Sequence, residues 1–496
     1  MRGSIDKSMQ VLTVAVLFFG LLGWTRLEAQ SPVTGSVFPG LDPDHQALIY
    51  ARLGASRPYS WQELAQIALW ASGDGTGTQS MNRIRAAAEE LKAAPSLPAD
   101  PRARGEFILS YIHHKLLKRY SDRQTRLDGI FVDGRYNCVS SAVLYVILAA
   151  SQGLEGWGVM TRDHAFVTVR AGKETIDVET TNPYGFDPGS RREFHNEFGR
   201  LTGFAYVPAR NYRDRADLSP LELISLIFTN RIFDLETRGN YGGSVSLALN
   251  RTALLSQRPH PVSSPFFADP EQDLLDRLLN FGVSLVKAGK EDEALQWAAL
   301  AGKRYPHARW EEFTYGALNN FLVKLIRSQQ FTEAKRVLAV HASTLSQRNM
   351  DRLSALITDA ELVHQSSRVR TVSEAEASLR AINDTQNVLS PVRVEELRTF
   401  VLLKEGELLA AEQGWRPALN FLETAVKHYG RNSRLDNALQ VFRSNRVAEI
   451  HNHFVDLFNG KKYHDALRVI MDGLAELPGN RQLQSDLARV EQALRS

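Results

Sequence analysis

Three residues in the first half of the chain have side chains that together could perform acyl-transfer chemistry. They are Cys138, His164 and Asp177. A cysteine thiolate attacks a carbonyl carbon, but it needs a base that also protonates the leaving group, and an imidazole serves both purposes. A carboxylate that accepts the second imidazole N–H holds the ring in place. These residue types in this order therefore predict a nucleophile, a general base and acid, and an orienting acceptor.

Cys138 is the only cysteine of the 496 residues, which excludes an intramolecular disulfide framework and a Cys-rich metal cluster. Residues 133–137 are turn formers, and Ala142, Leu144 and Leu148 then follow on one apolar helical face. We therefore predict the thiol at a helix N-terminus. Exposed N–H groups there favour the thiolate and can hold an oxyanion. An inert, buried thiol is the ordinary alternative for a lone cysteine.

His164 and Asp177 fall in short β-rich runs that flank a turn at Gly172. In a hairpin symmetric about that turn, His164 lies opposite about position 180. A modest register shift or a bulge would bring Asp177 beside the imidazole. Acids such as Glu179 are more often solvated or capping residues than catalytic ones, but Glu179 shares a strand face with Asp177 if the strand is regular and could contribute to the site.

Further aromatic and amide side chains are candidates for lining a substrate cleft. Trp157 precedes His164 by a few residues and is the best aromatic for this position. Tyr136 and Asn137 directly precede the cysteine and are further candidates. The substrate-cleft candidates are therefore Tyr136, Asn137, Trp157 and Glu179.

Composition and charge exclude several classes of function. The chain has 59 basic and 56 acidic residues and a formal net charge of +3, so neither a nucleic acid nor an anionic surface is favoured as a partner. The pairs His113-His114 and His451, His453 lack a metal spacing such as HExxH, and we expect these histidines to be surface or partly buried residues. We expect no cofactor and no metal.

The apolar spacing changes along the first half of the chain. Residues 60–152 have helical spacing, and the β-rich runs begin at Gly156. Helices followed by strands predict an α+β arrangement rather than alternating βαβ units.

The second half of the chain is predicted to be helical. Ser219 is a good helix cap and Pro220 suits the first helical position, while residues 257–270 are a linker rich in Pro and Ser. The helical segments after the linker resemble degenerate tetratricopeptide (TPR) repeats, with small residues that let paired helices approach. Their alanines are 40, 84 and 48 residues apart rather than a regular 34, and a generic helical bundle is the alternative. These alanines are Ala294, Ala334, Ala418 and Ala466.

Cys138, His164 and Asp177 also lie in sequence motifs that resemble those of a known family. Tyr-Asn-Cys at a helix start, then Asp-His-Ala-Phe-Val, then Ile-Asp-Val-Glu-Thr-Thr resembles the transglutaminase-like superfamily of papain-type cysteine proteins, over residues 107–186. The resemblance implies a papain-type α+β domain with Cys138 as nucleophile, His164 as general base and acid, and Asp177 as imidazole orienter. The fusion to TPR-like helices is similar to a bacterial branch of that superfamily.

Two departures limit this resemblance. Asp177 is followed by Val-Glu-Thr, where many family members have Asp-Pro-Thr. No glutamine stands shortly before Cys138, as it does in papain-type oxyanion holes.

The N-terminus has the pattern of a secretory signal. Arg2 and Lys7 precede the apolar run of residues 11–24. These 14 residues are too few to cross a bilayer comfortably, which takes about 20. An uncleaved anchor to the inner membrane is the alternative. We therefore expect an exported protein, periplasmic in a Gram-negative-type bacterium, with membrane contact only through this segment.

Together these features predict an exported cysteine enzyme that acts on peptide or isopeptide amide bonds through a thioester. The substrate is a protein or peptide, and hydrolysis and crosslinking both stay open. The helical region is expected to bind a protein partner. The alternative is a non-catalytic peptide- or protein-binding scaffold with the same parts. The predicted parts are residues 1–29 (signal or anchor), 30–215 (transglutaminase-like domain), 216–256 (helical hairpin), 257–270 (linker) and 271–496 (TPR-like repeats).

Overall fold

A computed structural model describes residues 38–74, 77–162, 164–188, 215–258, 262, 264, 266–385 and 387–495. The predicted signal or anchor lies outside these residues. The chain divides into two compact units, Met1–Gly40 and Leu41–Ser496, and every helix and strand named below belongs to the second. Within the described ranges, no helix has the length and apolar character needed to cross a membrane.

The chain is mainly helical. Helices make up 71% of the structure and strands 6%, in two small sheets, so a papain-type α+β domain is not evident and the predicted fold class is wrong. The physical reason is the shortness of the β-rich runs. Turn residues end each strand early, and the strands of the larger sheet contain only 5, 7, 5 and 3 residues.

Capping side chains mark the beginnings of the first helices. Ser60 accepts a hydrogen bond from the Glu63 N–H, and the Glu63 carboxylate accepts one from the Ser60 N–H, which forms a capping box. Asp100 caps helix α5 (Pro101–Lys115), in which Pro101 takes the first position. The helices are α2 (His45–Ser56), α3 (Trp61–Ser72), α4 (Thr78–Ala93), α5 (Pro101–Lys115), α6 (Leu127–Asp133) and α7 (Cys138–Ser151).

Helix α7 forms the centre of this part of the chain. Its residues from Val139 to Ala149 are buried without a break, as expected of a helix that is apolar all round. It packs against α3, α5 and α9 (Pro220–Thr237) and against two strands of the sheet. Cys138 is therefore the first residue of a helix that is held in place by packing on every side.

The larger sheet is antiparallel, with the strand order β5-β4-β3-β6. The predicted turn between β4 and β5 is confirmed, with Gly172 at a φ of 67° that glycine adopts without strain. The register pairs Thr168 with Asp177. The strands are β3 (Gly156–Met160), β4 (Ala165–Ala171), β5 (Glu174–Val178) and β6 (Ala216–Leu218), and a parallel pair is formed by β1 (Arg119–Tyr120) and β2 (Arg135–Tyr136).

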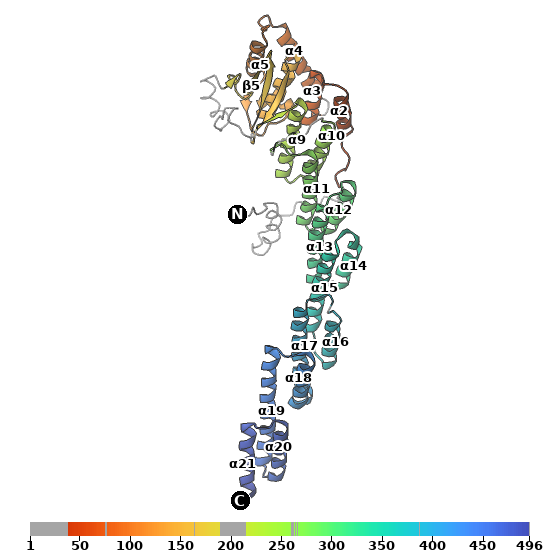
Figure 1. Ribbon diagram of the computed structural model, residues 1–496, viewed down its shortest axis with the longest axis vertical. Helices are drawn as coiled ribbons and strands as arrows, with labels where there is room; N and C mark the ends of the chain where they lie inside the picture. Colours follow the sequence, from red (N-terminus) through yellow and green to blue (C-terminus); the bar gives the residue numbers. More distant parts are fainter. Residues whose placement is uncertain are drawn as a thin grey trace. The chain divides into compact units, whose positions relative to one another are not determined.

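After β6 the described chain is helical, and successive helices pack against one another (Figure 1). The predicted cap at Ser219 is confirmed, since Ser219 and Glu222 form a capping box with Pro220 at the first position. The four alanines named above are completely buried between helices. The helices are α10 (Tyr241–Leu255), α11 (Pro270–Lys287), α12 (Glu291–Arg304), α13 (Arg309–Arg327), α14 (Phe331–Val340), α15 (Gln347–Ser367), α16 (Val372–Asn383), α17 (Pro391–Gln413), α18 (Trp415–Tyr429), α19 (Ser433–Asn459), α20 (Tyr463–Glu476) and α21 (Arg481–Arg495), with the short 3₁₀ helix η4 (Ala342–Thr344) after α14.

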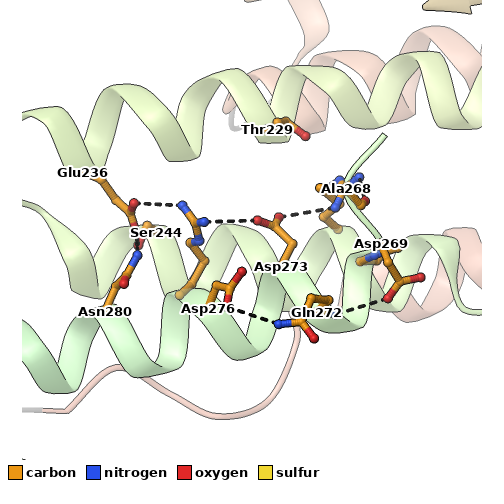
Figure 2. Close-up of polar contacts among 12 residues, drawn as sticks. Thr229, Glu236, Ser244, Ala268, Asp269, Gln272, Asp273, Asp276 and Asn280 are labelled. Atoms are coloured by element: carbon orange, nitrogen blue, oxygen red, sulfur yellow. Dashed lines mark hydrogen bonds and ion pairs between the residues drawn. The ribbon is translucent and has the colours of Figure 1, made fainter. Parts of the chain in front are cut away.

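A polar network joins α9, α10 and α11 across the predicted linker (Figure 2). Arg251 is 1% exposed, pairs with Asp273 at 3.3 Å and donates to the Ala268 carbonyl at 2.8 Å. Arg277 of α11 pairs with Glu236 of α9 at 2.8 Å. Because buried charges are costly unless they are paired, these bonds hold the three helices in one arrangement.

Glu405 is a buried carboxylate in the middle of α17. It is 3% exposed, and its Oε2 has no hydrogen-bond partner among the described residues. Burial, helped by the charge of Glu376 and opposed by Arg380, raises the pKa of Glu405 to about 7. The unfolded chain releases this proton near the ordinary value of 4.5, so the folded state holds it longer and stability falls as the pH rises from about 4.5 through 7.

Glu405→Gln is therefore expected to stabilise the protein above pH 7 by about 1–2 kcal/mol, and by less at about pH 5, because the amide has no ionisation to suppress. Urea unfolding of wild type and variant at both pH values measures this. Glu407→Gln, at an exposed position of the same helix, is the control. An equal effect of Glu405→Gln at both pH values would contradict the prediction.

Candidate active site

The predicted helix start at the cysteine is confirmed, because α7 begins at Cys138. Asn137 is its cap: the side-chain oxygen accepts from the Ser140 N–H at 2.9 Å, and the side-chain amide donates to the Asp122 carbonyl at 3.1 Å. Cys138 itself is partly exposed. The thiol therefore lies at the positive end of a helix dipole, within reach of solvent.

His164 directly precedes β4, and Glu179 directly follows β5. The Nε2 atom of His164 is 2.6 Å from Oε2 of Glu179. The other carboxylate oxygen of Glu179 accepts from the backbone N–H of Thr181 at 3.1 Å and from its hydroxyl at 2.7 Å. Glu179 is 2% exposed, so its charge is buried, and both of its oxygens are bonded.

The same imidazole lies close enough to Cys138 for the thiol to act on its pKa. Burial by itself lowers the pKa of His164, but the Glu179 charge and the hydrogen bonds to Cys138 and Glu179 raise it well above its ordinary value. The imidazolium form of His164 is thus favoured at neutral pH, and it lies beside the Cys138 side chain.

The predicted place of Asp177 beside the imidazole is wrong. The hairpin pairs Asp177 with Thr168, four residues and about 13 Å along the strand from His164. The Asp177 carboxylate accepts from the Thr168 hydroxyl at 2.6 Å and from the Arg215 guanidinium at 2.8 and 2.9 Å. A hairpin symmetric about Gly172 would pair Asp177 with position 167, but the observed register pairs it with Thr168. This shift of one residue moves Asp177 away from the imidazole.

A tight turn brings Glu179 to the imidazole instead. β5 ends at Val178, and the Glu179 N–H donates to the Gly185 carbonyl at 2.8 Å, while the Gly185 N–H donates to the Asn182 carbonyl at 3.0 Å. A Cβ atom at Gly185 would collide with the Glu179 carbonyl oxygen, so the turn needs a glycine. Sequence reasoning kept Glu179 as a cleft candidate, and the turn shows why it reaches the histidine.

The other cleft candidates have different surroundings from those expected. Tyr136 is 4% exposed and donates its hydroxyl to the Thr181 carbonyl at 3.2 Å. Asn137 is bonded on both sides as the helix cap. Trp157 pairs with Thr168, four residues from His164, and the Arg170 guanidinium lies 5.8 Å from the centroid of its ring. Tyr136 and Asn137 therefore support the backbone, and Trp157 lies on the sheet row that contains Asp177.

Sequence reasoning missed residues that surround the pair. The hydroxyls of Ser141 and Thr180 are 2.8 Å apart, and Nε2 of His113 is 3.1 Å from the Thr180 carbonyl. Burial raises the pKa of Tyr120, the charges of Cys138 and Glu179 raise it further, and its ring packs edge-on against Tyr136. No spacing signal marks these residues, since they come together only through packing.

Comparisons with known proteins do not assign the chain: no family model matches it, and no curated protein matches it. Within the described ranges, no group of three or more His, Cys, Asp or Glu side chains is arranged to hold a metal ion. The Cys138–His164–Glu179 geometry is therefore the observation on which a functional assignment depends.

Glu179→Gln is expected to slow alkylation of Cys138 by iodoacetamide at about pH 6 by about tenfold. Removing the carboxylate charge lowers the pKa of His164, so less of the thiolate–imidazolium pair forms. Asp177→Asn, two residues earlier on the same hairpin, is the matched control and should leave the rate within about twofold. The rates are measured by mass spectrometry of the labelled chain.

A larger loss for Asp177→Asn than for Glu179→Gln would contradict the assignment of Glu179. Equal rates for both variants and wild type would show that neither carboxylate acts on the imidazole.

Proposed function

We propose that the protein is a cysteine acyl-transfer enzyme that attacks peptide or isopeptide amide bonds through Cys138. One observation carries the proposal: the imidazole of His164 contacts both Cys138 and the buried carboxylate of Glu179. A base placed between a nucleophile and an orienting acceptor supports nucleophilic catalysis.

The reaction proceeds in two balanced steps. Sγ of Cys138 bonds to the amide carbon, the C–N bond breaks, and the His164 imidazolium gives its proton to the leaving amine. A thioester remains on the enzyme. Water or a second amine then attacks the thioester carbon, His164 accepts the proton of the attacking group, the C–S bond breaks, and the Cys138 thiolate and His164 imidazolium are restored. The Ser140 and Ser141 N–H groups of α7 are bonded to Asn137, so the N–H groups of the first two residues, Cys138 and Val139, are the ones that suit the oxyanion of each step.

We propose that the helices from α11 to α21 bind a protein partner and present it to the enzyme. Large apolar side chains are exposed on several of these helices, including Phe400, Val441 and Met471. Exposed apolar side chains of this kind suit protein contacts. Export, with substrates in the cell envelope, is part of the proposal and is supported by the positive start and the apolar run of residues 11–24.

The wild-type protein is expected to react with p-nitrophenyl acetate in a burst of about one nitrophenolate per chain, because the acyl group stays on one thiol. Mass spectrometry should find the acetyl group on Cys138. Cys138→Ala should give no burst, and His164→Ala should slow acetylation by at least about 100-fold. Adding monodansylcadaverine shows whether an amine or water resolves the thioester.

If the wild-type protein is acetylated no faster than His164→Ala, the proposal that the protein is an enzyme is wrong. The chain would then be a non-catalytic binding scaffold, in which Cys138 is an ordinary thiol.

A further inference from the structure

We propose that His113 is a positioning residue of the site, which fixes the backbone next to Glu179 and so holds the carboxylate against His164. The inference rests on the proposed function, because it concerns the same thiolate–imidazolium pair. In this role His113 is a neutral N–H donor. It acts through Glu179 and does not contact a substrate.

The contacts of His113 place it at the turn that carries Glu179. It lies in the last turn of α5, and its Nε2 is 3.1 Å from the Thr180 carbonyl oxygen. Its ring packs edge-on against Tyr136, with centroids 6.0 Å apart and planes at 84°. Tyr136 in turn donates its hydroxyl to the Thr181 carbonyl. Two successive carbonyls after Glu179 are thus held by side chains from α5 and β2.

A third element holds the same turn. The Thr180 hydroxyl is 2.8 Å from the hydroxyl of Ser141, which lies in the first turn of α7, close to Cys138. The N–H and hydroxyl of Thr181 bind Oε1 of Glu179. Residues 180–181 therefore link the carboxylate to α5, β2 and α7, and a displacement of this backbone displaces the carboxylate.

The protonation state of His113 suits this role. Burial lowers the pKa of His113 to about 4, although the Thr180 hydrogen bond and the Glu179 charge act in the opposite direction and His114 adds to the lowering. The ring is therefore neutral at pH 7, and its contact with a carbonyl assigns the proton to Nε2. A permanently charged donor here would compete with His164 for Glu179, whereas a neutral one leaves the carboxylate to the catalytic imidazole.

The test follows the pH midpoint of Cys138 alkylation by iodoacetamide, from about pH 5 to about pH 9, in the full chain. His113→Leu removes the donor and is expected to raise the midpoint by about one pH unit, because a less well-held Glu179 stabilises the imidazolium less. His113→Gln keeps an N–H donor and should restore the wild-type midpoint. His114→Leu is the matched control, since His114 is exposed and bonds within its own helix to Ser110.

Equal midpoints in His113→Leu and wild type would overturn the proposal. Equal shifts in His113→Leu and His113→Gln would also overturn it, since the N–H would then not be the cause. NMR of the wild-type imidazoles gives a test that needs no variant: His113 should be neutral with its proton on Nε2 down to about pH 5, and a charged ring at about pH 6 would overturn the proposal. The nitrophenolate burst of the wild type tests the enzyme itself and is independent of these outcomes.

Discussion

The buried contact between Glu179 and His164 imposes the strongest physical constraint on this part of the molecule. A carboxylate with 2% of its surface exposed is tolerated only if it is paired and hydrogen-bonded. The imidazole satisfies one oxygen, and the backbone and hydroxyl of Thr181 satisfy the other. The turn after β5, with a glycine at position 185, follows from this need, because a regular strand would leave the carboxylate opposite Phe166.

The nucleophile depends on a different kind of support. Helix α7 has no solvent-facing side from Val139 to Ala149, so its position is set by α3, α5, α9 and the sheet together. Asn137 ends the preceding segment and starts the helix in the same place, by bonding to Ser140 on one side and to Asp122 on the other. The histidine and its acceptor come from loops next to the sheet, whereas the thiol comes from the core. The site exists where these two parts meet.

Some of this arrangement could be predicted from sequence because it is local. Turn formers before Cys138 and apolar spacing after it locate the helix start, and Gly172 locates the hairpin. The partner of His164 could not be predicted, because hairpin register depends on packing of both strand faces, and one residue of shift decides whether Asp177 or another acid is near. The predicted fold class is wrong because the β-rich runs form only short strands, whereas helices account for 71% of the structure.

The network around Arg251 has a consequence for how the chain unfolds. Arg251 and Asp273 belong to helices on either side of the Pro/Ser-rich segment, and both are shielded from water. Separating α10 from α11 would break this buried pair and the hydrogen bond from Arg251 to the Ala268 carbonyl. The two helices on either side of the Pro/Ser-rich segment are therefore joined by a buried ion pair as well as by the chain itself, so we expect them to open together.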